Sequence, residues 1–152
     1  MNQEPEILVI AHNSSEVIFN LLDELYGKFN ISVVDNASHD STVEKIKSVY
    51  PQINLIELKN NIGYGNASNI ILENTKNKYV LLLNPDIEIK SEEILKFLEI
   101  SKTLDFTVTG LPEDIPPIEG QKTEELYVET DWVMGCVMLF NGSSRKCVPT
   151  DV

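Results

Sequence analysis

The stretch VLLLNPDIEI, residues 80–89, is an apolar run that stops at Asn84, Pro85 and Asp86 and then resumes. Its first part consists of branched apolar residues, which is typical of a buried strand. Proline cannot donate a hydrogen bond to a neighbouring strand, so the strand should end just before it. The run therefore predicts a core strand over 79–84 that places the carboxylate of Asp86 outside the core, in the crevice where ligands bind.

Other apolar runs share this character and alternate with segments of helical period. Together with the first run they predict strands over residues 7–11, 31–35, 53–58, 79–84 and 107–110. Strands that are apolar nearly throughout, separated by amphipathic helices, are typical of parallel sheets joined by right-handed crossovers. The pattern predicts an α/β fold: a Rossmann-like, mostly parallel sheet with helices on both faces.

Three helices have recognisable ends in the sequence. The segment 14–27 stops at a glycine and has one apolar face, made of Val17, Ile18, Leu21, Leu22 and Leu25. The segment 41–51 opens with a capping-box pattern from Ser41 to Glu44 and stops at Pro51. Ser91 is the predicted cap of a third helix over 91–100.

Beyond Gly110 the alternation breaks. Residues 111–125 are polar and proline-rich, which predicts a surface loop, and residues 125–130 and 131–140 predict further strands. A chain of 152 residues, 42% of them hydrophobic, fits one domain with a single core, so we expect residues 1–152 to form one unit.

The charge balance is strongly acidic: 24 acidic and 12 basic residues give a formal net charge of −12. Arg145 is the only arginine, which argues against a nucleic-acid partner. An acidic excess is typical of a solvated surface, and it is also compatible with a site that holds an anion through a divalent cation.

The start of the chain, MNQEPEILVIAHN, has no basic region, and no apolar run approaches the roughly 20 residues that span a bilayer. We expect a cytoplasmic protein without a transmembrane segment. Cys136 and Cys147 are expected to be reduced thiols, because two cysteines alone make no metal site.

Polar residues follow the first four predicted strands: His12 and Asn13, Asp35 and Asn36, residues 60–65, and residues 84–86. The carboxyl ends of parallel strands meet at one edge of a sheet, where ligands of such folds bind. A single polar strand end is most often an ordinary turn. Four clusters at one edge predict a binding site.

The residue types indicate the chemistry of this site. The Asp35 carboxylate can accept from a pyrimidine imide or a ribose hydroxyl, or it can cap the following helix. Gly63 and Gly65 permit positive φ and close backbone approach at a strand-to-helix turn. The spacing is not GxGxxG and no glycine follows the first strand, which argues against a dinucleotide-binding dehydrogenase. Asp86 is a candidate ligand for Mg²⁺ or Mn²⁺.

The motifs VVDNASHDST (33–42), NNIGYGNASN (60–69), LLLNPDIEI (81–89) and DWVMG (131–135) resemble those of the family 2 glycosyltransferases of GT-A fold. Their order and spacing are closest to the rhamnosyltransferase-like branch, and the resemblance covers essentially the whole chain. It implies a transferase of polysaccharide biosynthesis that binds a nucleotide-diphosphate sugar and transfers the sugar, with inversion, to a saccharide or lipid-linked acceptor.

The resemblance also implies residue roles. Asp35 would bind the nucleobase, and Asp86 would bind the divalent metal on the diphosphate. Candidates for nucleotide binding are Asn13, Asp35, Asn36, Asn61, Gly63, Asn69 and Asn84, and candidates near the donor sugar are Trp132 and Gly135. Asn84 replaces the first acid of the more familiar DxD pattern, so we expect weak metal binding until a diphosphate completes the coordination shell.

The catalytic base is unknown. Members of the family continue into an acceptor half with a Glu-Asp pair, whereas Asp151 is the only acidic residue after Gly135. We expect residues 1–152 to be the donor half, with slow transfer or none and some donor hydrolysis. His12 and His39 are assigned no role. The alternative is a catalytically incomplete nucleotide-sugar-binding or interaction module. Apolar surface or a sheet edge left uncovered by the strand at 132–140 would favour a homodimer.

Overall fold

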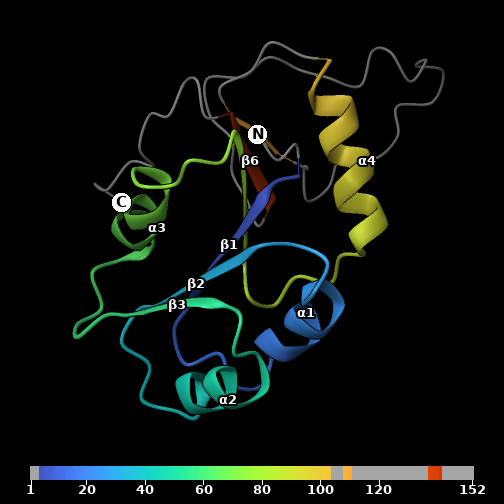
Figure 1. The fold of residues 1–152 in the computed structure, drawn as a ribbon. Coiled ribbons are helices and arrows are strands. Elements are labelled where there is room, and N and C mark those ends of the chain that lie inside the picture. Colours follow the sequence, from blue (N-terminus) through green and yellow to red (C-terminus); the bar gives the residue numbers. More distant parts are fainter. Residues whose placement is uncertain (1–3, 104–107, 111–136, 142–152) are drawn as a thin grey trace, which may run out of the picture.

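The computed structural model describes residues 4–103, 108–110 and 137–141 (Figure 1). The predicted loop over 111–125, the predicted strand over 125–130 and residues 131–136 lie outside the described residues. The strands are β1 (Glu6–Ala11), β2 (Ile31–Asp35), β3 (Asn54–Glu57), β4 (Tyr79–Leu83), β5 (Val108–Gly110) and β6 (Val137–Asn141). The helices are α1 (Ile18–Leu25), α2 (Thr42–Val49), α3 (Tyr64–Leu72) and α4 (Ser91–Ser101).

Within the described residues the strands form one six-stranded sheet in the order β3-β2-β1-β4-β6-β5. The first four strands are parallel, and β6 runs antiparallel to both β4 and β5. The prediction of a mostly parallel α/β sheet is confirmed. The chain passes from β1 outward to β3 and then returns to place β4 on the other side of β1, so the strand order reverses between β1 and β4.

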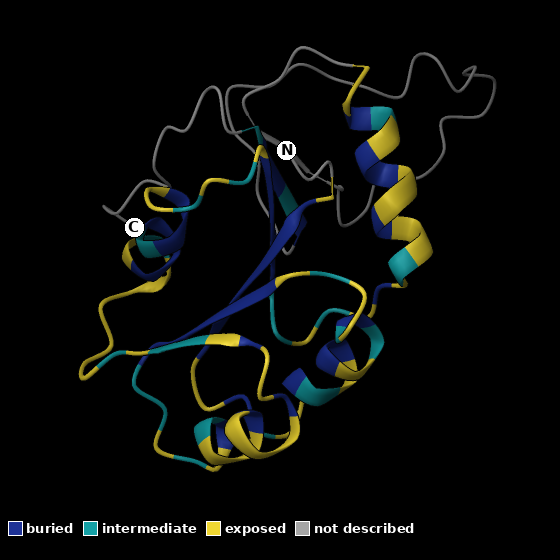
Figure 2. Cartoon of the chain, viewed as in Figure 1, coloured by how far each residue is buried: buried dark blue, intermediate teal, exposed yellow. Residues whose placement is uncertain are grey.

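Helices cover both faces of the sheet, as predicted (Figure 1). Helices α1, α2 and α4 pack on the face that carries Ile7, Val9 and Leu81, whereas α3 packs on the face that carries Leu8, Ile10 and Leu82. Because successive strand residues point to opposite faces, a strand covered on both sides must be apolar at every position. This explains why β1, β2 and β4 are buried along their whole length (Figure 2).

Helix α1 is shorter than predicted. The carbonyl of Ser14 accepts hydrogen bonds from the amides of both Val17 and Ile18, so residues 15–17 form a turn and the helix begins at Ile18. Val17, predicted on the apolar face, is 41% exposed for this reason. The other four predicted face residues are buried: Ile18, Leu21, Leu22 and Leu25. The helix ends as predicted, because Gly27 adopts a φ of 77°.

The predicted caps are wrong in detail. Ser41 precedes α2, but its side chain makes no capping hydrogen bond; Asp40 Oδ1 accepts from the amide of Thr42 instead, at 3.0 Å. Ser91 is the first residue of α4 and not its cap. Lys90 occupies the N-cap position of α4, and its backbone amide donates a hydrogen bond to Glu93 Oε2 at 2.7 Å.

The sheet-edge premise for a homodimer does not hold for the described part of the strand predicted at 132–140, whereas residues 132–136 lie outside the described residues and the homodimer stays a prediction. Strand β6 pairs with β4 on one side and β5 on the other, so residues 137–141 form no sheet edge. Among the described residues the edges are β3 and β5. Strand β3, predicted over 53–58, is shorter and only partly buried, with both terminal residues exposed, which suits an edge strand. None of the helices in the described residues has the length and apolar character needed to cross a membrane.

Candidate functional site

The carboxyl ends of the parallel strands meet at one edge of the sheet. Ala11 pairs with Asp35, and Asp35 pairs with Glu57, so β1, β2 and β3 end at the same level. Leu83 pairs with Val9, and the chain after β4 leaves along the same edge. The loops after β1 and β4 therefore flank the point where strand order reverses, which is the usual ligand position in open α/β sheets.

Asp35, the last residue of β2, is the most unusual polar group at this edge. Its side chain is only 3% exposed. Oδ2 accepts a hydrogen bond from the amide of Ser38 at 3.1 Å, but Oδ1 is buried and has no hydrogen-bond partner among the described residues. Asp35 does not cap the following helix, because α2 begins only at Thr42 and Asp40 accepts from its amide. A buried carboxylate oxygen without a donor is costly, so Oδ1 can accept one further hydrogen bond at this position.

Asn36, also 3% exposed, joins three strand-end loops. Its amide donates to the carbonyl of Ala11 at 2.7 Å, and its carbonyl accepts from His12 Nδ1 at 2.8 Å. Its side-chain Nδ2 donates to Asn61 Oδ1 at 3.0 Å, and its Oδ1 accepts from the amide of Ile62 at 2.9 Å. All four kinds of polar group on Asn36 are occupied, so this side chain fixes the loops around Asp35.

The loops after β1 and β2 are joined further out. Asn13, with a φ of 50°, donates its amide to Ser38 Oγ at 2.8 Å, and its Oδ1 accepts from the amide of His39 at 2.8 Å. Ala37 also has a positive φ, of 61°. Non-glycine residues adopt this conformation rarely and mostly at functional or over-determined positions. At Asn13, the hydrogen bonds to Ser38 and His39 offset the energetic cost of the positive φ.

Asp40 connects the same two loops one turn later. Its carboxylate accepts from the amide of Ser15 at 3.0 Å and from both the amide and the hydroxyl of Thr42. Burial raises the pKa of Asp40, but the sum of these hydrogen bonds is larger, and its pKa lies well below the usual range. The charged Asp40 side chain therefore joins the loops after β1 and β2 and has a structural role.

The loop between β3 and α3 carries the glycine motif. Gly63 has a φ of 84°, and a Cβ added there would meet nothing within 4 Å, so the conformation and not close packing requires glycine. Asn61 Oδ1 accepts from the amide of Gly63 at 3.0 Å. Gly65 is the second residue of α3 and has no positive φ, so that part of the prediction is wrong. Asn69 lies further along α3 and is buried.

The loop after β4 carries Asn84 and Asp86. Asn84 Oδ1 accepts from the hydroxyl of Tyr64 at 3.1 Å, and its carbonyl accepts from the amide of Ile87 at 3.3 Å. Ile87 and Ile89 pack against the core, whereas Asp86, the residue just before Ile87, is exposed. Among the described residues the Asp86 carboxylate has no hydrogen bond or ion pair. It is free to bind a ligand.

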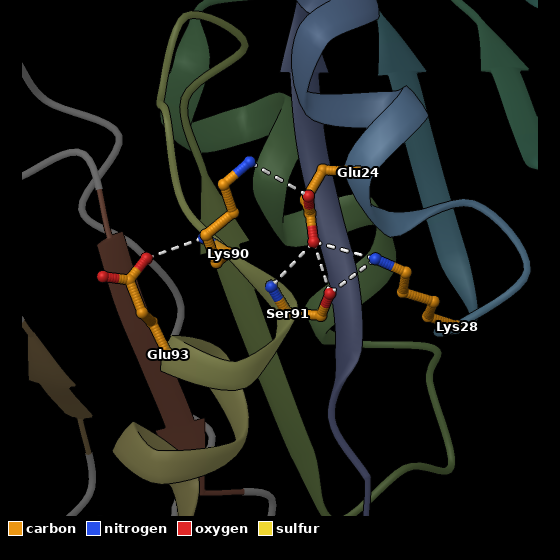
Figure 3. A network of polar contacts seen from close by, with 5 residues as sticks. All are labelled: Glu24, Lys28, Lys90, Ser91 and Glu93. Atoms are coloured by element: carbon orange, nitrogen blue, oxygen red, sulfur yellow. Dashed lines mark hydrogen bonds and ion pairs between the residues drawn. The ribbon is translucent and has the colours of Figure 1, made fainter.

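The far end of this loop is fixed by Glu24 of α1 (Figure 3). Glu24 Oε1 accepts from Lys28 Nζ at 2.8 Å, from the amide of Ser91 at 3.1 Å and from the Ser91 hydroxyl. Glu24 Oε2 accepts from Lys90 Nζ at 3.2 Å. The core side chains and Glu24 thus hold both ends of the segment that presents Asp86.

These contacts predict a pH dependence of stability. The hydrogen bond from Lys28, followed by those from Ser91 and Lys90, holds the pKa of Glu24 well below its ordinary value of 4.5. A carboxylate whose pKa is lower in the folded state stabilises the fold above its unfolded pKa, and this contribution is lost as the pH falls through the folded pKa. Melting temperatures measured below about pH 5 should therefore fall less steeply for Glu24→Gln than for the wild type.

Glu99→Gln is the matched control for this measurement, because Glu99 is exposed on α4 and has no hydrogen bond or ion pair among the described residues. Its melting temperatures should follow those of the wild type. Identical pH profiles for the wild type and Glu24→Gln would show that Glu24 has no stabilising role.

A groove of about 440 Å³ lies at the opposite edge, by the amino ends of β1, β2 and β3. It contains none of the predicted site residues. The Glu6 carboxylate at this groove accepts from the Ser32 hydroxyl at 2.6 Å, from Asn77 Nδ2 at 2.8 Å and from the Thr75 hydroxyl. These side chains form hydrogen bonds with one another. The groove therefore has fewer polar groups left to bind a ligand than the carboxyl edge has.

Trp132 and Gly135, the donor-sugar candidates, lie outside the described residues. Among the other candidates, the structure places at one edge Asn13, Asp35, Asn36, Asn61, Gly63, Asn84 and Asp86, whereas Asn69 lies further along α3 and is buried. Sequence reasoning missed Tyr64 and Glu24. Tyr64 stands beside the glycine motif, which is a usable signal, whereas nothing in the local sequence links Glu24 to residues 90 and 91.

The fold and the site define a Rossmann-like α/β protein with a polar site at its topological switch point. The family model of glycosyl transferase family 2 matches residues 6–122. The chain therefore belongs to glycosyl transferase family 2.

Two curated relatives agree with this assignment. The low-salt glycan biosynthesis hexosyltransferase Agl10 of Haloferax volcanii is 28% identical over 159 residues, which cover 99% of this chain and 50% of that protein. The teichoic acid poly(glycerol phosphate) polymerase of Staphylococcus epidermidis is 32% identical over 136 residues, which cover 84% of this chain and 18% of that protein. The chain spans half or less of the length of these relatives.

Two solved structures share the fold. Residues 1–349 of S. aureus TarS in complex with UDP match with a TM-score of 0.68 and 18% identity, over 92% of this chain and 47% of that one. The mannosyltransferase PcManGT from Pyrobaculum calidifontis in complex with GDP-Man and Mn²⁺ matches with a TM-score of 0.69 and 19% identity, over 98% of this chain and 48% of that one. The predicted GT-A fold is confirmed.

Proposed function

We propose that residues 1–152 form the donor half of a glycosyltransferase and bind a nucleotide-diphosphate sugar at the carboxyl edge. The observation that carries this proposal is the buried, unpaired Oδ1 of Asp35. A bound donor group would satisfy that oxygen, and the donors that suit it are the imide N–H of uracil, thymine or guanine and a ribose hydroxyl. Adenine has no imide N–H, so adenine nucleotides should bind less well where Asp35 accepts from the base, whereas equal binding of ADP would assign the ribose hydroxyl to Asp35.

The proposal includes a divalent metal at Asp86. Residues 12–13, 35–40, 60–64 and 84–88 at this edge contain no Lys or Arg that would neutralise a diphosphate, and the lysines that flank them in sequence are Lys59 and Lys90, of which Lys90 pairs with Glu24. Asp86 provides a free carboxylate, which suits Mg²⁺ or Mn²⁺. The described residues contain no group of three or more His, Cys, Asp or Glu side chains that could hold a metal by themselves. Diphosphate oxygens would have to complete the coordination shell, so metal binding should depend on the nucleotide.

When bound, the metal would neutralise charge on the leaving diphosphate. The chain's own residues would position the donor: Asp35 would bind the base or ribose, and Asn36 would hold the loops around it. We also propose nucleotide-binding roles for Asn13, Asn61, Gly63, Asn69 and Asn84. Trp132 and Gly135 remain the candidates for the donor sugar.

The comparisons support the donor class. Solved structures with this fold contain UDP, UDP-GlcNAc, or GDP-Man with Mn²⁺, and one curated relative is a hexosyltransferase. We propose inverting transfer to a saccharide or lipid-linked acceptor as the activity of the whole protein. No catalytic base is assigned.

Calorimetric titration with UDP, dTDP, GDP and ADP, each with and without Mn²⁺, tests the donor site. We expect at least one of the first three to bind, more tightly with Mn²⁺, and ADP to bind most weakly. Failure of all four to bind under either condition would favour an interaction module on the same scaffold.

A further inference from the structure

Tyr64 and Asn84 form a contact that the proposed donor site does not yet explain. Tyr64 is the first residue of α3 and is 37% exposed, and its hydroxyl donates to Asn84 Oδ1 at 3.1 Å. The two residues are 20 positions apart in sequence: Tyr64 begins the helix that follows the glycine motif, and Asn84 lies in the loop after β4. The contact therefore connects the glycine loop directly to the loop that presents Asp86.

The hydrogen bond sets the orientation of the Asn84 carboxamide. Its oxygen faces the Tyr64 hydroxyl, so its Nδ2 group, which carries two protons, points away from that hydroxyl. Among the described residues Nδ2 has no hydrogen-bond partner. Asn84 lies two residues before Asp86 at the carboxyl edge. A free donor group at this place suits an oxygen-rich ligand such as a diphosphate or a ribose.

We propose that Tyr64 is a positioning residue that orients Asn84 to donate a hydrogen bond to the bound nucleoside diphosphate, an inference that rests on the proposed donor site. Position 84 then supplies a neutral donor in place of a second carboxylate. This division of roles leaves Asp86 as the carboxylate of the pair that faces the metal.

A double-mutant cycle tests the proposal. The affinity for UDP, or for the tightest-binding nucleotide of the panel, is measured with saturating Mg²⁺ for the wild type, Tyr64→Phe, Asn84→Ala and the double variant. Tyr64→Phe should weaken binding about three- to tenfold, the range for one hydrogen bond. In the Asn84→Ala background the same change should have no effect, because Tyr64 acts only through Asn84.

Tyr50→Phe is the matched control. It removes a tyrosine hydroxyl that donates to Asp23 at 2.5 Å, away from the carboxyl edge. This variant should bind nucleotide as the wild type does. An equal cost of Tyr64→Phe in both backgrounds would mean that Tyr64 contacts the ligand itself, and no cost in either would mean that the contact is irrelevant. Both results overturn the proposal.

A second measurement needs no nucleotide. In the free protein, nuclear magnetic relaxation of the Asn84 side-chain NH₂ should show restricted motion that Tyr64→Phe releases. Free motion in the wild type would overturn the positioning role even if nucleotide binds. An ordered Asn84 in a protein that binds no nucleotide would instead overturn the donor site, and the positioning role with it.

Discussion

Asp35→Asn should weaken nucleotide binding by about 1 to 3 kcal/mol, or roughly 5- to 150-fold. The change keeps the shape of the side chain but removes its charge and places a donor where the ligand's donor would approach. It should not lower the stability of the free protein, because Oδ1 is buried without a partner and a neutral amide costs less to bury than a carboxylate. Calorimetry with UDP and thermal unfolding of the free variant give the two readouts.

The control for Asp35→Asn is Asp23→Asn. Asp23 also accepts a hydrogen bond, from the Tyr50 hydroxyl, but it lies on α1 away from the carboxyl edge. This variant should lose some stability and keep its affinity for nucleotide. If Asp35→Asn unfolds at a lower temperature and binds nucleotide normally, then Asp35 serves the fold and not the ligand.

Asp86→Asn should remove the dependence of nucleotide binding on the metal, with a loss of affinity of about 10- to 100-fold in the presence of Mn²⁺. The reason is that Asp86 is the exposed carboxylate that the loop after β4 presents without any partner of its own among the described residues. Without the metal, the wild type and the variant should bind nucleotide with similar affinity. Calorimetric titrations with Mn²⁺ and with a chelator measure both conditions.

Glu88→Gln makes the same change of charge two residues further along the same loop. Glu88 is also exposed. This variant should keep its metal dependence. An equal loss in both variants would show that the total charge of the loop, and not coordination by Asp86, determines the effect of the metal.

The sheet could be predicted because its strands are buried on both faces. Such strands must be apolar at every position, so residues 7–11, 31–35 and 79–84 stand out in the sequence. The carboxyl-edge location of Asp35 and Asp86 then follows from topology alone. The ends of strand β3 were harder to predict because β3 is an edge strand and is only partly buried.

The helix starts could not be predicted reliably. Three consecutive polar candidates, Asp40, Ser41 and Thr42, compete to cap α2, and the choice of Asp40 depends on Ser15, which lies 25 residues earlier. Val17 fits the helical period but falls in the turn that Ser14 closes. Local pattern specifies that a helix exists, whereas contacts from distant parts of the chain select its first residue.

The candidate site was predictable in its members but not in their contacts. Asp35 and Asn61 were expected at the edge because each follows a strand. The unpaired oxygen of Asp35, the four hydrogen bonds of Asn36 and the Tyr64–Asn84 contact all depend on side-chain geometry between separate loops. Periodicity carries no information about such contacts.

A nucleoside diphosphate and a divalent metal should bind together at the carboxyl edge. Mn²⁺ broadens nuclear magnetic resonance signals of nearby amides, and the effect falls steeply with distance. With UDP and a small amount of Mn²⁺, the amide signals of Gly63, Ile87 and Glu88 should broaden most, while those of Asn30 and Gln52 at the amino edge should stay sharp. Broadening centred on Asn30 and Gln52, or no broadening that depends on UDP, would contradict the account.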